Sequence, residues 1–335
     1  MAVTRKDVAS LAGVSPALVS YVINGGPRAV SDDARRRIVQ AIEALSYRPD
    51  GLARSLRTRT TQTLALIVPD AANPFFAELA RSIEDEAFGH GYAVLVCNSA
   101  DDRAREQVYL SNLADRRIDG LIFISTSTAS DQDLVELTRL GIPVVAVDRT
   151  PDDSPISTVR VDNVEAAYIG TTHLIEHGHT RVGLIAGPDG GVAHDRLTGW
   201  KAALAEHALP DGVVVAAPFT HAGGQQAGIA MFSETEFPTA VVVSSDAQAI
   251  GLLHALDAVG LRTPNDVAMV SIDGTEAAAF TVPPLTSVSQ PLHEMARLAV
   301  GQLLRERVDA SALAHAEVRT QLVRRRSCGC PPHAH

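Results

Sequence analysis

The spacing of apolar positions divides the chain into two parts. Within residues 1–46, apolar residues recur at the spacing of amphipathic helices. From residue 62 onward, short and almost uninterrupted apolar runs alternate with longer amphipathic stretches, which is typical of parallel strands covered by helices on both faces. The expected strands are 64–68, 92–97, 121–124, 144–147, 182–186, 213–217, 240–243 and 267–272. Because these strands fall into two series, we predict a body made of two α/β lobes with parallel sheets.

Three short helices are expected in the first part. The first begins after Thr4, whose side chain can cap it, and ends at Gly13. Ser15 caps the second, which starts with Pro16, a residue favoured at the first helical position. Ser31 begins the third. Because only a very short turn separates the first two helices, the pattern predicts a helix-turn-helix, whose second helix can enter the major groove of DNA.

The distribution of charge supports this prediction. Residues 1–60 contain ten Lys/Arg and five Asp/Glu, a balance of +5, whereas the whole chain has a net charge of −10. A cationic head on an anionic body suits a head that meets a polyanion. A generic helical bundle is the alternative interpretation of the three helices. The positive charge and the tight turn favour DNA binding over it.

Length and composition exclude several classes of protein. At about 150 residues per domain, 335 residues correspond to two or three folding units that can form a core without disulfides or metals. No stretch approaches the about 18 apolar residues of a membrane span, and the amino terminus does not look like a secretory signal. The three cysteines, Cys97, Cys328 and Cys330, form no disulfide framework. We therefore expect a cytoplasmic protein with no membrane partner.

Residues 47–61 form a candidate hinge between the head and the body. A short helix here would be unfolded alone in water but could form on docking. Leu56 lies between Arg54 and Arg57, and an apolar side chain flanked by arginines is of the type that wedges between base steps in a minor groove. An inert linker is the alternative, and the residues alone favour neither.

Several segments resemble the LacI/GalR family of bacterial transcription regulators. They are TRKDVASLAGVSPALVSYVING, VSDDARRRIVQAIEALSYRPDGLARSLRT and LALIVPDAANPFF, followed in order by HLIEHGHTRVGLIAGP, RLTGWKAAL, SSDAQAIGLLHAL and DVAMVSIDGTEAAAFTVPPLTSVSQP. The resemblance covers nearly the whole chain. It implies a homodimer whose two heads bind double-stranded, pseudo-palindromic operator DNA, with hinge helices that fold together in the central minor groove and Leu56 as the wedge.

The resemblance also implies roles for individual residues in DNA binding. Thr4, Ser15, Ser20 and Asn24 match positions that hold phosphates, Pro16, Ala17 and Tyr21 match positions that face base edges, and Ala53, Arg54 and Leu56 match the hinge. Tyr21 replaces the arginine that is usual in the family, and neither Pro16 nor Ala17 can make a paired contact to a base. We therefore expect few specific contacts between the head and the base edges. Discrimination between operator sequences should depend more on the hinge and on DNA deformability.

Polar residues that follow the expected strands are the first candidates for ligand contacts, because ligands of open α/β sheets bind beyond the carboxyl ends of the strands. They are Asp70, Asn73, Ser125, Asp148, Arg149, Ser245, Asp246 and Asp273, together with Arg196 and Trp200 in the helix after Gly187. Carboxylates and a guanidinium can pair with vicinal hydroxyls, and Phe75 or Phe219 could cover a sugar ring. Taken singly, most of these residues have a simpler interpretation as helix caps. Trp200 has a simpler interpretation as a core residue.

The resemblance favours part of this set. Asp148, Arg196, Ser245 and Asp273 match positions that bind the effector in similar proteins, with Asn73, Phe75 and Gln290 second in rank. Ser245 replaces a frequent asparagine, which weakens the assignment of any particular sugar. The expected partner is a small molecule, a carbohydrate.

No motif indicates catalysis. HLIEH at 173–177 fits the string of an inverted zinc protease, with His179 nearby as a third ligand, but histidines also complement a helix carboxyl end. The two cysteines near the carboxyl terminus could bind a metal weakly with His333 and His335, although a frayed terminus is the simpler interpretation. The glycines make no dinucleotide fingerprint, and neither lysine fits a phosphate-binding loop. We predict no catalytic residue, no cofactor and no bound metal.

These observations combine into one predicted organisation. Residues 1–46 are an all-α helix-turn-helix domain, 47–61 are the hinge and linker, and 62–335 are an effector-binding and dimerisation domain with a periplasmic-binding-protein-like fold. The lobes are expected at 62–160 plus 290–322 and at 161–289. The predicted function is a ligand-responsive repressor of transcription. A solute-binding protein of a sugar transporter would share the body, but it has no use for a cationic helical head.

Overall fold

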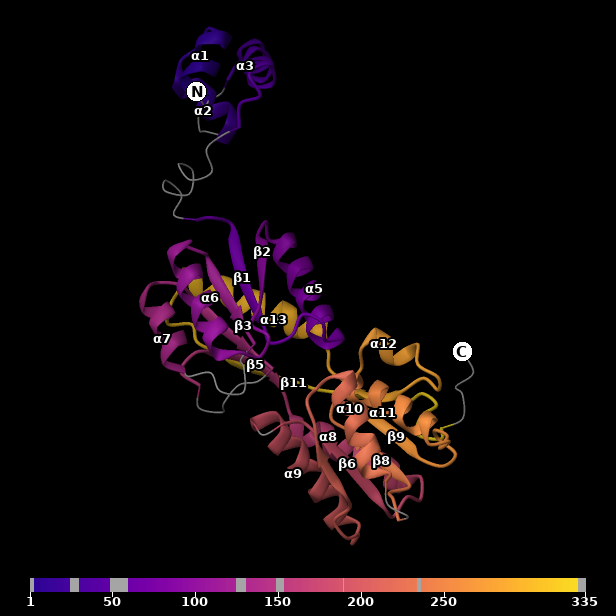
Figure 1. The fold of residues 1–335 in the computed structure, drawn as a ribbon. Coiled ribbons are helices and arrows are strands. Elements are labelled where there is room, and N and C mark those ends of the chain that lie inside the picture. Colours follow the sequence, from indigo (N-terminus) through magenta and orange to yellow (C-terminus); the bar gives the residue numbers. More distant parts are fainter. Residues whose placement is uncertain are drawn as a thin grey trace. The chain divides into compact units, whose positions relative to one another are not determined.

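The computed structural model describes residues 3–24, 30–48, 60–124, 131–148, 154–188, 190–233 and 236–330 (Figure 1). The chain divides into two compact units, Met1–Thr61 and Gln62–His335. The first unit contains the cationic helical head, and the second contains the body. No helix in the described part of the chain is long and apolar enough to cross a membrane.

The head contains the three helices that the sequence predicts. They are α1 (Arg5–Ala12), α2 (Pro16–Asn24) and α3 (Asp32–Ala44). Ser15 Oγ accepts a hydrogen bond from the Leu18 amide at 3.3 Å, and Ser31 Oγ accepts one from the Ala34 amide at 3.4 Å, so both residues act as helix caps. The helices enclose one small core, formed by Val8, Ala9, Ala12, Val19, Ile38 and Ala41.

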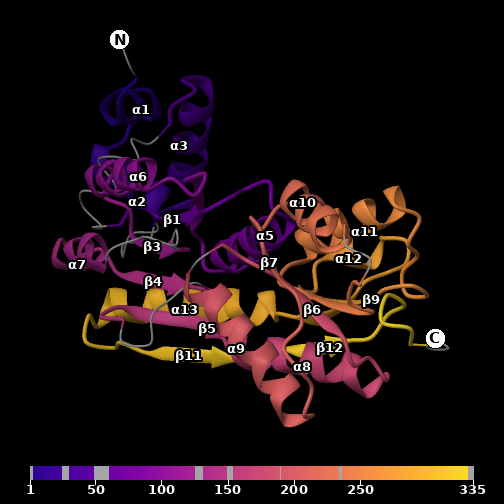
Figure 2. The ribbon, with the colours of Figure 1, turned by 60° about the horizontal axis from the view of Figure 1, so that its bottom comes forward.

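The first lobe of the body is a six-stranded parallel sheet with the strand order β11-β5-β4-β3-β1-β2. Its strands are β1 (Thr63–Val68), β2 (Ala93–Asn98), β3 (Gly120–Phe123), β4 (Val144–Val147), β5 (Ser157–Val161) and β11 (His315–Val318). One face is covered by α5 (Pro74–Gly89) and α13 (Leu292–Val308), and the other by α6 (Arg103–Asp115) and α7 (Asp131–Arg139). Figure 2 shows α13, from late in the chain, beside β5 and β11.

The second lobe repeats this arrangement with the strand order β12-β10-β9-β8-β6-β7. Its strands are β6 (Val182–Ala186), β7 (Val214–Ala216), β8 (Ala240–Val243), β9 (Ala268–Asp273), β10 (Thr286–Ser289) and β12 (Gln321–Val323), of which only β12 is antiparallel to its neighbour. One face is covered by α8 (Asn163–Glu176) and α9 (Gly191–Glu206), and the other by α10 (His221–Met231), α11 (Asp246–Ala258) and the short α12 (Glu276–Ala279).

The chain passes between the lobes after β5, after β10 and after β11. The last of these passages lies close to residue 322, where the approximate bounds expected for the first lobe end. β11 does pair with β5 of the first sheet, but β12 pairs with β10 of the second sheet. The missed strands β5, β10, β11 and β12 are short and mix polar with apolar residues, so they lack the continuous apolar run of the predicted strands.

One glycine sets the close approach of α8 and α9. A Cβ atom at Gly199 would lie 2.0 Å from the backbone carbonyl oxygen of Val164. Because helix backbone cannot move aside as a side-chain tip can, Gly199→Ala should lower the free energy of unfolding by about 1–3 kcal/mol. Gly301→Ala in α13 is the matched control, since its Cβ would meet nothing within 4 Å. Denaturant unfolding of both variants checks this expectation, and equal effects would contradict it.

Candidate functional site

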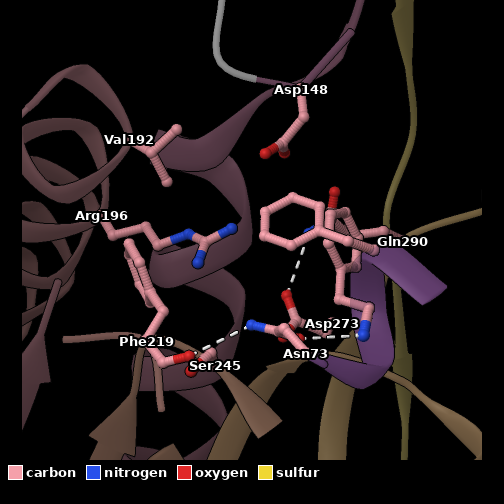
Figure 3. A pocket seen from close by; sticks show the side chains of 10 residues that line it. Asn73, Asp148, Val192, Arg196, Phe219, Ser245, Asp273 and Gln290 are labelled. Atoms are coloured by element: carbon pink, nitrogen blue, oxygen red, sulfur yellow. Dashed lines mark hydrogen bonds between the residues drawn. The ribbon is translucent and has the colours of Figure 1, made fainter. Parts of the chain in front are cut away.

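A pocket of about 290 Å³, partly open to solvent, lies between the lobes at the carboxyl ends of their strands (Figure 3). Ten residues line it: Asn73, Phe75, Phe76 and Asp148 from the first lobe, Val192, Arg196, Phe219, Ser245 and Asp273 from the second, and Gln290 from a passage between them. In each sheet the chain winds to both sides of one strand, β1 or β6, and ligands of open α/β sheets bind at such switch points.

Arg196 on α9 brings its guanidinium to the pocket while its other contacts hold it in place (Figure 3). Its Nε donates to Asn163 Oδ1 at 2.9 Å, and its Nη1 donates to the carbonyl oxygen of Ser244. The central carbon of the guanidinium lies 5.9 Å from the centre of the Phe219 ring. A guanidinium fixed in this way is suited to donate paired hydrogen bonds to a ligand.

Asp273 is a buried carboxylate at the end of β9. It accepts hydrogen bonds from the Asp246 amide at 3.2 Å and from Gln290 Nε2 at 3.1 Å. Burial, followed by the nearby carboxylate of Asp246, raises the pKa of Asp273 well above its ordinary value, and Arg196 opposes this shift only in part. The Gln290 Oε1 atom is buried with no hydrogen-bond partner among the described residues. A ligand with hydroxyl groups could satisfy both residues.

Both carboxylates of the pocket have unusual backbone angles. Asp148 follows β4 and points into the pocket from the first lobe (Figure 3). Its φ is 68°, and the φ of Asp273 is 125°. Residues other than glycine seldom adopt such angles, which cost about 1–3 kcal/mol each and cluster at ligand sites. The surrounding structure therefore holds both side chains in place against a local cost.

Two hydrogen bonds between described residues connect the lobes, and one of them joins residues that line the pocket. Asn73 caps α5 by accepting from the Phe75 amide at 3.0 Å, and its Nδ2 donates to the carbonyl oxygen of Phe219 in the other lobe at 3.1 Å. Glu78, also on α5, accepts from the Glu276 amide of α12 at 2.9 Å. Since both bonds span the lobes, they must break or move when the lobes change their relative position.

The polar residues after β8 also serve the fold. Ser245 Oγ accepts from the Gln248 amide at 3.2 Å and so caps α11. The Asp246 carboxylate accepts hydrogen bonds from the Thr275 amide at 2.7 Å and the Thr275 hydroxyl at 2.8 Å, as well as from the hydroxyls of Ser271 and Ser287. These donors fill the acceptor capacity of a carboxylate. Asp246 is therefore satisfied within the protein, whereas Asp273 retains capacity for a ligand.

The predicted DNA-reading residues follow one face of α2. Ser15, Pro16 and Ala17 are exposed, and Ser20 and Tyr21 are half-buried. Leu18, Val19, Val22 and Ile23 of the same helix face the head's core. Because residues three and four apart share a helix face, the polar and apolar sets lie on opposite sides of α2. The residues predicted to contact DNA from the hinge, Ala53, Arg54 and Leu56, lie outside the described residues.

The amino-terminal end of the first helix is fixed by a pair of short contacts. The amide and the hydroxyl of Thr4 both donate to Asp7 Oδ2, at 2.8 Å and 2.7 Å. These hydrogen bonds lower the pKa of Asp7. They hold the exposed Thr4 at the start of α1. Asn24, another predicted phosphate contact, is the last residue of α2.

Comparisons with known proteins reveal the relatives of this chain. Residues 4–50 match the family model described as bacterial regulatory proteins, lacI family, and residues 61–316 match the one described as periplasmic binding proteins and sugar binding domain of LacI family. The chain belongs to the LacI family. The ribose operon repressor of Escherichia coli (strain K12) is 36% identical over 304 residues, which cover 90% of this chain and 92% of that repressor.

Two solved structures extend the likeness to the fold. The lac repressor dimer bound to operator and the anti-inducer ONPF has a TM-score of 0.87 and 27% identity, covering 98% of this chain and 99% of that one. A LacI family transcriptional regulator from Enterococcus faecium with bound ribose has a TM-score of 0.73 and 26% identity, covering 79% of this chain and 98% of that one. The predicted fold class and family are confirmed. This LacI-family member is a DNA-binding transcription regulator with a ligand-binding body, and its relatives are repressors rather than enzymes.

The structure of this LacI-family member brings together all the residues predicted for effector binding. Asn73, Phe75, Asp148, Arg196, Ser245, Asp273 and Gln290 line the same pocket. Val192 and Phe76 were missed, because an apolar residue beside polar candidates gives no signal in the sequence. Trp200 is fully buried in the core of the second lobe, so its interpretation as a core residue is confirmed. Of the other strand-end residues, Ser125 and Arg149 lie outside the described residues. Ligand binding by the seven residues stays a prediction.

The contrast between the two buried carboxylates predicts opposite effects of the same substitution. At pH 7, Asp273→Asn should raise the Tm of the ligand-free regulator, because it removes a charge that burial disfavours, and Asp246→Asn should lower it by removing a satisfied acceptor. Since the folded-state pKa of Asp273 is raised, its cost to the fold is full above that pKa and declines as the pH falls from that pKa to the unfolded-state pKa. The gain from Asp273→Asn should therefore shrink in acid. Scanning calorimetry across pH measures both effects, and a gain that grew in acid would be inconsistent with this account.

Proposed function

We propose that this chain is a homodimeric repressor whose affinity for a pseudo-palindromic operator is set by a neutral monosaccharide bound between its lobes. The single observation that carries the ligand class is the lining of the pocket. Two carboxylates and one guanidinium stand beside three phenylalanine rings, which together suit hydroxyl groups on one side and the apolar faces of a sugar ring on the other.

The polar groups of the pocket narrow the choice of ligand. Its lining offers two carboxyl groups, Asp148 and Asp273, and a single guanidinium, Arg196, a set that suits hydroxyl groups better than a phosphate, which is bound by several cationic donors. The name of the ribose operon repressor and the ribose bound in the Enterococcus faecium regulator support a pentose as the first candidate.

The ligand acts by binding one arrangement of the lobes more tightly than another. It contacts Asp148 on the first lobe and Arg196 and Asp273 on the second, so its affinity depends on their separation. The bonds from Asn73 to Phe219 and from Glu276 to Glu78 join the lobes in the arrangement that the structure describes. A coupling of about 1–3 kcal/mol between ligand and operator is typical of such systems.

On the DNA side, α2 lies in the major groove of each half-site. Thr4, Ser15, Ser20 and Asn24 contact phosphates, and Pro16, Ala17 and Tyr21 face base edges. Ala17 can touch a thymine methyl and Tyr21 offers one hydroxyl, so the hinge residues Ala53, Arg54 and Leu56 and the deformability of the duplex supply much of the specificity. Acting on chromosomal DNA, the protein works in the cytoplasm.

Enzymatic activity is not part of this proposal. The pocket's carboxylates are held by protein donors or by unusual backbone angles, and no nucleophile with an adjacent base lies among its lining residues. A solute-binding protein remains the alternative for the body alone. The cationic head, with its polar face on α2, favours the DNA-binding function.

Ligand binding is tested by thermal shift against neutral pentoses and hexoses and against their phosphates. A neutral monosaccharide should raise the Tm, because a ligand that binds only the folded protein stabilises it by mass action. Asp148→Asn should remove this shift. Asp70→Asn, whose carboxylate serves a turn by accepting from the Ala72 amide, is the control and should keep it. Shifts with sugar phosphates alone would contradict the ligand class.

DNA binding is tested by fluorescence anisotropy with fragments from the region upstream of the chain's own coding sequence. Leu56→Ala should weaken specific binding far more than nonspecific binding, because wedging is required only in the specific complex. Leu11→Ala, which truncates an exposed leucine of α1, is the control. Equal losses of both kinds of binding in Leu56→Ala would argue against the wedge. The same titration with and without the identified sugar measures the coupling.

A further inference from the structure

Two histidines at the end of α8 face two cysteines from the carboxyl-terminal segment that follows β12. His173 is buried in the last turn of α8, and His177, one turn later, ends the helix at the surface. Their ring centres lie 4.6 Å apart. Cys328 is buried in the core of the second lobe, and Cys330 is half-buried beside the two rings. About 150 residues separate the two pairs in the sequence, so neither pair alone predicts the cluster.

The distances within this cluster are those of a metal site. Cys330 Sγ lies 3.6 Å from His173 Nε2 and 3.4 Å from His177 Nε2. The ligand atoms of His173, Cys328 and Cys330 all lie within 4.8 Å of one another. In a tetrahedral zinc site, Zn–S bonds of about 2.3 Å and Zn–N bonds of about 2.0 Å place sulfur and nitrogen about 3.5 Å apart. The separations of Cys330 from both rings therefore match those of a bound ion, while the other ligand atoms would have to move closer together from separations of up to 4.8 Å.

The local chain geometry turns both sulfurs toward the histidines. Gly329 has a φ of 87°, a left-handed conformation that glycine adopts without strain, and it reverses the chain between Cys328 and Cys330. The Thr286 hydroxyl donates to Cys328 Sγ at 3.0 Å. Donors to the sulfur of a ligating cysteine are a regular feature of metal sites, because they orient the ligand.

The cluster differs from both groups of metal ligands that the sequence suggests. The sequence suggests His179 as a third ligand beside HLIEH, but its Nδ1 lies 3.1 Å from Thr239 Oγ1 and it is absent from the cluster. His333 and His335 lie outside the described residues. The donors that the fold brings together come instead from one helix and from the Cys-Gly-Cys segment.

We propose that His173, His177, Cys328 and Cys330 bind one Zn²⁺ in a structural site that fastens the carboxyl-terminal segment to α8. Two thiolates and two imidazoles are a donor set that zinc takes in closed, four-coordinate sites. Four protein ligands leave no position for a substrate, so the site is not that of a hydrolase. This departs from the prediction of no bound metal.

The site would tie together the two ends of the second lobe. α8 is the first element after the chain first enters this lobe, and Cys328 and Cys330 follow β12, where the chain enters it for the last time. Figure 2 shows β12 beside α8. Zinc binding is therefore expected to stabilise the body without contact with the pocket, and it does not depend on which ligand the pocket takes.

Metal content is measured on the full-length protein, produced untagged with zinc present and purified without chelator. We expect about one zinc per chain by elemental analysis and two free thiols masked by the metal. Removing zinc with a strong chelator should lower the Tm, and Co²⁺ added to the stripped protein should give the visible bands of tetrahedral thiolate coordination. Absence of zinc together with absence of these Co²⁺ bands would overturn the proposal, as would a Cys328–Cys330 disulfide found by mass spectrometry.

Matched variants identify the ligands. Cys330→Ser and His177→Asn should each weaken zinc binding by more than the about 10–100-fold typical of losing an outer hydrogen-bond partner of a ligand. Cys97→Ser and His179→Asn change the same residue types away from the cluster and should keep the metal. A chain ending at Cys330 should also keep it. Because His177 is exposed, its replacement leaves the fold intact, and retention of the metal in His177→Asn and Cys330→Ser would refute the assignment.

Discussion

The ligand site depends on a carboxylate that the fold buries without satisfying fully. Asp246 and Asp273 stand at the ends of neighbouring strands, β8 and β9, and both are almost inaccessible to water. Asp246 receives all its hydrogen bonds from the protein, whereas Asp273 receives two and has a raised pKa. A buried charge with too few donors costs free energy until a partner supplies them. Burial thus leaves Asp273 with hydrogen-bonding capacity that the proposed ligand can use.

The same constraint explains why the pocket needs both lobes. Sheets of parallel strands gather their polar strand ends at one edge, and each lobe presents that edge to the other. Asp148 comes from the first lobe and Asp273 from the second, so neither lobe alone forms the set of donors and acceptors. Because Asn73 both caps its own helix and donates across to Phe219, local helix formation and the meeting of the lobes are linked through one side chain.

The sequence predicts what depends on local pattern and misses what depends on distant contact. The buried strands such as β1 and β8 are continuous apolar runs and could be placed, whereas β12, three residues with polar neighbours, becomes a strand only by pairing with β10. The polar pocket residues follow strands and so could be found. Val192 could not, because nothing distinguishes it from a core valine. The cluster of Cys330 with His173 required the folded chain, since the two motifs are unrelated in the sequence.

Three short chain segments join the lobes, and they restrict how the lobes can move. Sliding or separating the lobes would stretch all the segments together, whereas rotation about a line through them strains them little. Gln290 lies on one of these segments and reaches Asp273 through its amide. A ligand that contacts Gln290 therefore binds close to the axis of this rotation. In a rigid-body rotation the displacement of a residue grows with its distance from the axis, so a small change at Gln290 moves the far side of each lobe the most.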